Sequence, residues 1–196
     1  MNQRFGTIML MVVLPLSVGA MASGPIDTDG DAVADHYDAC PGTPVATPVY
    51  ANGCIKQSHG QLCIATDDGA WFPADCQQNN IPPILFSFAK DDVRFDQWPQ
   101  LAMVSELLSQ YPDIRIILNG HADIIGLESK NQALSEARAQ QVRYVLSYKF
   151  GFHPNRIEIR GFGSRLPVAE NVSEQGRQAN RRVDYQISFG LENNNH

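Results

Sequence analysis

The sequence predicts an α+β fold in which two helices pack on a mixed sheet, joined to a small, irregular, disulfide-tied N-terminal module. Between residues 84 and 189, strand-like and helix-like patterns follow one another in the order β-α-β-α-β-β. A sandwich with both helices on one face of the sheet is the economical packing for that order. Residues 23–80 have few large apolar side chains but hold all four cysteines. The 196-residue chain therefore fits one ordinary domain with an appendage.

The first half of the larger domain follows from local patterns. Residues 84–88 form a short apolar run, which predicts a strand. Asp96 is a suitable N-cap for the helix that follows, and Pro112 ends it. One face of this helix carries Leu101, Val104, Leu107, Leu108 and Tyr111. Residues 114–118 are apolar nearly throughout, which predicts a central strand.

The second half begins with a long helix, predicted over residues 128–150 with Gly151 as its stop. Its expected buried stripe consists of Leu134, Ala137, Gln141, Val142, Val145 and Leu146. Residues 156–161 predict a third strand. Residues 182–189 alternate between apolar and polar side chains, which predicts a last strand with one buried face.

The first 22 residues are typical of a secretory signal peptide. Arg4 precedes an apolar run from Phe5 to Val18, and Ala20-Met21-Ala22 then forms a small-x-small cleavage site. An uncleaved anchor is the alternative, because the run approaches the length that spans a bilayer. No cysteine follows the cleavage site, so the residue that a bacterial lipoprotein would acylate is missing. We expect an exported protein.

The cysteines predict two disulfides, because an exported chain meets an oxidising compartment. Three pairings are possible. We favour Cys40 with Cys54 and Cys63 with Cys76, since each closes a loop of about 15 residues, worth roughly 3 kcal/mol. A zinc site that combines these cysteines with His36 or His59 is the rival interpretation. It lacks a C-x-x-C pair and lies in the wrong compartment.

The negative charge belongs to the N-terminal module. Residues 23–80 contain eight acids and one base, whereas residues 81–196 contain thirteen of each. A neutral larger domain gives no support to nonspecific binding of nucleic acid, which needs a basic face.

An acidic stretch in this module has the spacing of a calcium-binding loop. Carboxylates stand at loop positions 1, 3, 5, 9 and 12, and a carbonyl would serve position 7, so the expected ligands are Asp27, Asp29, Asp31, Val33, Asp35 and Asp38. The match is incomplete, because position 6 is Ala32 rather than glycine and position 12 is aspartate rather than glutamate. A solvated acidic linker is the alternative to a bound calcium ion.

The chain is thus expected to divide into a signal peptide (1–22), the acidic module and linker (23–80), the larger domain (81–190) and a polar tail (191–196). The linker ends in the stiff segment Ile81-Pro82-Pro83.

Several polar residues of the larger domain are not explained by the packing of its helices and strands, and they predict a binding site. Asp123 lies just after the second strand, where loops present ligands. Asn131, Ser135 and Arg138 share one face of the following helix. If this face looks back at the loop, Asp123 and Arg138 form an opposed pair of charges. Such a pair suits a carbon that bears an ammonium and a carboxylate, although an internal salt bridge is the alternative.

Three ordered motifs carry a resemblance to a known family over residues 84–189. They are Gly120-His-Ala-Asp123-x-x-Gly126, Asn131-x-x-Leu134-Ser135-x-x-Arg138-Ala139 and Gly176-Arg177-x-x-Asn180-Arg181-Arg182-Val183. Together they resemble the OmpA-like C-terminal domain, the peptidoglycan-binding module of outer-membrane, Pal and flagellar motor proteins. The acidic stretch, continued through Cys40, resembles a single thrombospondin type 3 repeat, a calcium-binding module.

The resemblance implies noncovalent binding of peptidoglycan through diaminopimelate of the stem peptide. Asp123 would take the ammonium and Arg138 the carboxylate, with Asn131 and Arg181 completing the pocket. The chain departs from the family at Ala122, where threonine is usual, and at Ser87 and Ala89, where acids are common. These departures put the strength and breadth of recognition in question.

The sequence bears on two other classes of function. An enzyme is not expected, because no nucleophile-elbow motif and no recognisable pair of catalytic carboxylates is present. An adhesion or assembly protein, such as a flagellar-motor or secretion accessory, remains an alternative in which the calcium module meets an envelope protein and wall binding is only the anchor. Residues 23–80 are too few for eight membrane strands, so no β-barrel or porin activity is expected.

Overall fold

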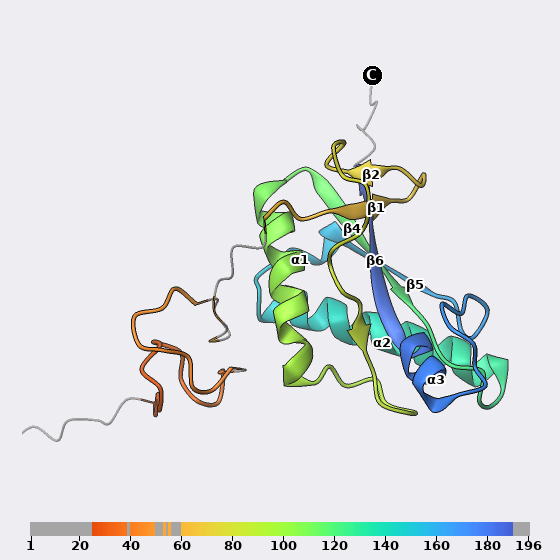
Figure 1. Cartoon of the computed structure of the whole chain (residues 1–196), viewed down its shortest axis with the longest axis horizontal. Coiled ribbons are helices and arrows are strands. Elements are labelled where there is room, and N and C mark those ends of the chain that lie inside the picture. Colours follow the sequence, from red (N-terminus) through yellow and green to blue (C-terminus); the bar gives the residue numbers. More distant parts are fainter. Residues whose placement is uncertain (1–24, 39, 50–52, 54, 56–59, 190–196) are drawn as a thin grey trace, which may run out of the picture.

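The computed structural model describes residues 25–38, 40–49, 53, 55 and 60–189. The predicted signal peptide, Cys54 and the predicted tail lie outside these residues. Figure 1 shows α1 (Trp98–Gln110) and α2 (Glu128–Tyr148) beside the sheet, with α3 (Glu174–Asn180) near one end of β6 (Arg182–Phe189). The predicted α+β class is confirmed.

The sheet is mixed and centred on two long strands. Its order is β2-β1-β6-β4-β5, and β3 also pairs with β6. The remaining strands are β1 (Ile64–Thr66), β2 (Trp71–Phe72), β3 (Ile84–Leu85), β4 (Ile114–Gly120) and β5 (Ile157–Gly161). β4 runs antiparallel to β6 and parallel to β5, so the prediction that it is central is confirmed.

The core lies between one face of this sheet and the two long helices. Alternate residues of β4 and β6 supply the sheet side, among them Ile116, Leu118 and Tyr185. The helix side includes Leu101, Val104, Leu107 and Leu108 of α1 and Val142, Val145 and Leu146 of α2. These are the apolar positions that the 3.6-residue period selects.

Two strands come from the segment assigned to the N-terminal module. β1 and β2 form a short hairpin, and β1 pairs in parallel with β6. A disulfide joins Cys63 to Cys76 across this hairpin, as predicted. Cys40 is also disulfide-bonded. The sheet therefore extends to the N-terminal side of the expected boundary at residue 80.

The helices differ from prediction at their ends and in one buried stripe. A 3-10 turn, Phe95–Gln97, precedes α1, so Asp96 does not cap that helix. In α2, Leu134 and Ala137 are only half-buried and Gln141 is exposed. The first half of α2 instead buries Asn131, Ser135 and Arg138.

This polar face lies close to the sheet because β4 ends in glycine. A Cβ atom on Gly120 would lie 1.9 Å from the backbone oxygen of Ser135. The hydroxyl of Ser135 accepts a hydrogen bond of 3.0 Å from the backbone N–H of Gly163. Close packing of α2 on the end of β4 is therefore possible only without a side chain at position 120.

The substitution Gly120→Ala tests this contact. We expect it to lower the free energy of unfolding by about 3 kcal/mol, because helix and strand must separate to admit the methyl group. Gly69→Ala is the control: its added Cβ meets no atom within 4 Å, but its φ of +88° is strained for alanine. We expect the control to lose about 1 kcal/mol. Equal losses in urea unfolding would contradict the proposed close contact.

A charged cluster stabilises the junction of β4 and β6. Asp184 lies 3.2 Å from His121 Nε2 and 2.9 Å from Arg182 Nη2. Burial opposes the charged form of Asp184, but its contacts with His121 and Arg182 outweigh this and lower its pKa below the ordinary 3.8. The folded chain therefore binds this proton less readily than the unfolded chain.

The sign of this shift predicts a pH dependence. The contribution of Asp184 is present above about pH 3.8 and is lost as the pH falls through its lower folded pKa. Asp184→Asn should cost about 1 to 3 kcal/mol at pH 7 and much less at pH 2.5, measured by urea unfolding. The control Glu158→Gln removes an exposed partner of Arg160 and should cost under about 0.5 kcal/mol at both values. A deficit in Asp184→Asn that does not change with pH would refute the assignment.

Candidate functional site

A pocket of about 180 Å³ lies where the loop after β4 meets the first half of α2. It brings together all four residues that the sequence predicts for ligand binding: Asp123, Asn131, Arg138 and Arg181. Its other lining residues are Phe88, Ala89, Ala122, Ile125, Gly126, Leu127, Lys130 and Leu134. The site thus combines a few charged groups with a mainly apolar wall.

Asp123 forms an ion pair with Arg181, so the internal salt bridge between Asp123 and Arg138, the alternative interpretation of the sequence, is not formed. Oδ2 of Asp123 accepts a hydrogen bond of 2.9 Å from Arg181 Nη1, and both side chains are about 95% buried. Oδ1 accepts a bond of 2.9 Å from the backbone N–H of Ile125. One carboxylate is therefore fixed in position by a cation and by its own loop.

Asn131 stabilises the same loop from α2. Its Nδ2 donates to the backbone carbonyl of Asp123 at 3.1 Å. Gly126 has a φ of +101°, a conformation that favours glycine, and this allows the loop to turn back toward the helix. The amide and the glycine together position the Asp123 carboxylate at the pocket.

Arg138 is fully buried and bound by backbone oxygens. Its guanidinium donates to the carbonyls of Lys90 and His121 at 2.8 Å and to that of Ser87 at 3.2 Å. It also lies 5.2 Å from the centre of the Phe86 ring. No carboxylate of the described residues is within ion-pair distance of it, so its positive charge faces the pocket without a bonded anion.

Burial also affects the pKa of Arg138. Loss of hydration lowers its pKa well below the ordinary value for arginine, to about 10, although the charge of Asp123 acts in the opposite direction. Arg138 is thus still a cation at neutral pH, but one whose charge is poorly solvated. A ligand carboxylate in the pocket would restore the missing counter-charge.

The short helix α3, which carries Glu174 next to Arg181, was not among the elements predicted from the sequence. Glu174 Oε1 accepts a hydrogen bond of 2.6 Å from Arg181 Nη2, and the other oxygen, Oε2, binds Arg177. Burial disfavours charged Arg181, but its bonds to Asp123 and Glu174 outweigh this and raise its pKa. The signal for α3 was Ser173, whose hydroxyl caps the helix at Gly176, followed by an acid in the first turn.

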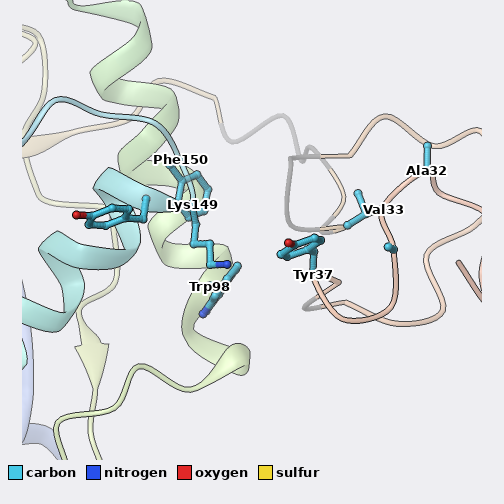
Figure 2. A pocket seen from close by; sticks show the side chains of 8 residues that line it. Ala32, Val33, Tyr37, Trp98, Lys149 and Phe150 are labelled. Carbon is cyan, nitrogen blue, oxygen red and sulfur yellow. The ribbon is translucent and has the colours of Figure 1, made fainter. Parts of the chain in front are cut away.

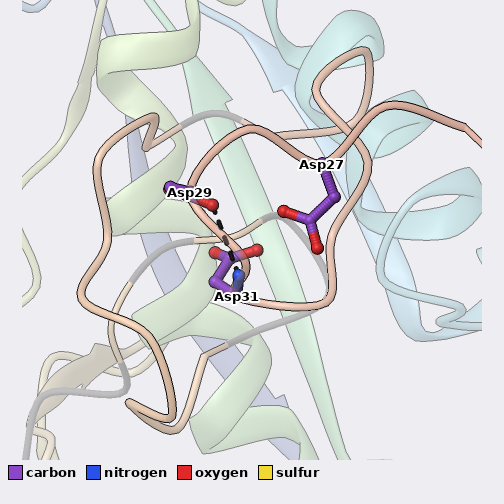
Figure 3. A group of neighbouring side chains, drawn as sticks. All are labelled: Asp27, Asp29 and Asp31. Carbon is purple, nitrogen blue, oxygen red and sulfur yellow. Dashed lines mark hydrogen bonds between the residues drawn. The ribbon is translucent and has the colours of Figure 1, made fainter.

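The acidic segment brings together three of its predicted ligands. Asp27, Asp29 and Asp31 each offer a carboxylate oxygen within 4.8 Å of the others, and Figure 3 shows them turned toward one another in one loop. Oδ2 of Asp31 is buried and has no hydrogen-bond partner among the described residues. Ala32 adopts a φ of +74°, the conformation expected of glycine at this loop position.

The other predicted ligands lie outside this three-carboxylate group. Both oxygens of Asp35 accept hydrogen bonds from Thr28. Asp38 accepts from the backbone N–H of Cys40, and burial together with neighbouring acids raises its pKa. Val33 donates its backbone N–H to Asp31.

A second pocket, of about 520 Å³, lies between the acidic segment and the far end of α2 (Figure 2). Trp98 and Phe150 line it from the larger domain, and Ala32, Val33 and Ala34 from the segment. Tyr37 and Lys149 meet across it, with Lys149 Nζ 4.9 Å from the centre of the tyrosine ring. None of the residues predicted for peptidoglycan binding lines this second pocket.

No helix in the described part of the chain combines the length and the apolar character that a membrane crossing needs.

Comparison with known proteins covers both the sequence and the fold. Outer membrane porin F of Pseudomonas aeruginosa is 33% identical over 162 residues, which are 82% of this chain but only 41% of that protein. The chain therefore spans well under half of this relative. The peptidoglycan-associated lipoprotein of Burkholderia pseudomallei has a TM-score of 0.52 at 28% identity, covering 54% of this chain and 89% of the other.

The C-terminal domain of MotB from Helicobacter pylori has a TM-score of 0.51 at 28% identity, covering 56% of this chain and 85% of that domain. The segment of the chain that matches a family model runs from residue 85 to residue 181 and contains the whole pocket. Its motifs, its mixed sheet and these likenesses agree. Residues 85–181 of this chain are an OmpA family domain.

Proposed function

We propose that the protein binds peptidoglycan noncovalently through the pocket of its OmpA family domain and so links an envelope structure to the cell wall. The observation that carries this proposal is the pair of opposite, buried charges at the pocket. Asp123 is a fixed carboxylate, and Arg138 is a buried cation without a bonded anion among the described residues. The peptidoglycan-associated lipoprotein, which shares this fold, supports the proposal by its name.

The chemistry of the ligand follows from these charges. A diaminopimelate side chain ends in a carbon with an ammonium and a carboxylate. Asp123 would bind the ammonium, and Arg138 the carboxylate. Each charge-assisted hydrogen bond contributes about 1.5 to 3 kcal/mol, which favours selective but reversible binding. We propose a binding role rather than catalysis, and release of soluble muropeptides from sacculi by the purified protein would contradict it.

Location follows from the same proposal. The predicted signal peptide and the disulfide between Cys63 and Cys76 suit an oxidising, extracytoplasmic compartment. We propose the periplasm, at the outer membrane or the wall.

We propose, as a second function, that Asp27, Asp29 and Asp31 bind calcium. A buried carboxylate oxygen without a partner is costly, and a divalent cation would satisfy the one on Asp31. Calcium prefers oxygen ligands and would neutralise the clustered charges. This acidic segment could then present an ordered surface to an envelope protein.

Sacculus binding tests the first proposal. Asp123→Asn and Arg138→Lys should each weaken co-sedimentation of the mature protein with purified sacculi by about tenfold or more, since each loses one charge-assisted contact. Arg156→Lys is a matched control, because Arg156 also binds backbone carbonyls, those of Leu108, Tyr111 and Ile114, outside the pocket.

The control separates folding from binding. We expect Arg138→Lys and Arg156→Lys to lower the melting temperature alike, while only Arg138→Lys loses wall binding. If Asp123→Asn and Arg138→Lys bind as well as the wild type, the pocket assignment is wrong.

Calcium titration tests the second proposal. The mature protein should give a saturable heat of binding and a higher melting temperature with calcium, because the ion binds the folded state. Asp31→Asn should lose both effects, whereas the control Asp92→Asn, in an exposed loop of the larger domain, should keep them. Absence of heat and of stabilisation in the wild type would refute calcium binding.

A further inference from the structure

We propose that Lys130 is a specificity-determining residue that binds a second carboxylate of the ligand. This inference rests on the proposed function of the pocket. It extends the recognised group from one ammonium and one carboxylate to one ammonium and two carboxylates.

The position of Lys130 on α2 suits this role. Lys130, Leu134 and Arg138 all line the pocket, and their spacing of four residues places them along one face of the helix. The backbones of the first and the last are about 12 Å apart at 1.5 Å per residue. Two long basic side chains thus flank an apolar one, which matches two carboxylates separated by an alkyl chain.

The charges of the pocket are not balanced by the protein itself. Three bases, Lys130, Arg138 and Arg181, line it together with one acid, Asp123. Within the part of the chain that the structure describes, only Arg181 of these three bases has ion pairs, with Asp123 and Glu174. Asp91 acts on Arg138 from outside the pocket lining. Among the described residues, Lys130 and Arg138 have no paired carboxylate, so the pocket favours a ligand with more than one anionic group.

The fold gives no other reason for a base at position 130. Lys130 is exposed and lies in the first turn of α2, where the helix dipole favours acids and disfavours bases. No hydrogen bond or ion pair of its side chain is found in the described part of the chain. A lysine at this position therefore does not stabilise the helix, but it does add a positive charge to the pocket.

The test uses two soluble stem tripeptides that end in diaminopimelate. In the first, the carboxylate at the peptide end is free; in the second, it is a primary amide. Both keep the distal ammonium and carboxylate that Asp123 and Arg138 would bind. Affinities are measured by calorimetry on the mature wild-type protein, on Lys130→Gln and on the control Arg143→Gln, which removes a charge about 20 Å further along α2.

We expect the wild type and Arg143→Gln to bind the free carboxylate about two- to fivefold more tightly than the amide, as an exposed ion pair would give. Lys130→Gln should bind both tripeptides equally and should lose the extra salt dependence of the first. If Lys130→Gln keeps the preference, or if the wild type shows none, the role of Lys130 is refuted while sacculus binding stands. A wild type that binds neither the tripeptides nor sacculi would refute both proposals.

Discussion

The burial of Arg138 is the constraint on which the site depends. A guanidinium removed from water requires acceptors, and this one takes backbone carbonyls from the loop after β3 and from the end of β4. It thereby ties two separate loops to the middle of α2. The close approach at Gly120 makes this reach possible, because the helix lies directly against the last residue of the strand. Packing and recognition therefore use the same contacts.

Because Asp123 pairs with Arg181, Arg181 and Arg138 have different roles in the pocket. Arg181 neutralises Asp123 and is itself held by Glu174 on α3, so this part of the pocket is balanced without a ligand. Arg138 keeps an uncompensated charge close by. A zwitterion would gain chiefly from its carboxylate at Arg138, while its ammonium would share an acid that already has a partner. This arrangement favours exchangeable contacts over tight ones.

Sequence reasoning predicted the elements that have a clear period and missed those that do not. The strand 182–189 and the helix from residue 128 are predicted because their apolar residues repeat regularly, and the strand 114–118 because it is apolar nearly throughout. The prediction that Leu134, Ala137 and Gln141 belong to the buried face of α2 is wrong. A pattern of apolar residues cannot show that a helix buries a face that carries an arginine. β1 and β2 comprise only five residues in total, which is too few to show a periodic pattern. β1 depends on β6 for its pairing in the sheet. The four pocket residues were found from motifs, but the ion-pair partner of Asp123 is set by tertiary packing.

Ser87 and Ala89 stand where the family resemblance implies acids, and both lie close to Arg138 or its pocket. At both positions the chain acts through its backbone. The carbonyl of Ser87 binds Arg138, and Ala89 adopts a φ of +55° at the wall of the pocket, where a larger side chain would narrow it. Acids at these positions would supply a negative counter-charge for Arg138. In this chain, a carboxylate of the ligand would have to supply that counter-charge. In the proposed binding mode, the lack of these acids favours an anionic group of the ligand, and Lys130 at the start of α2 would act in the same direction.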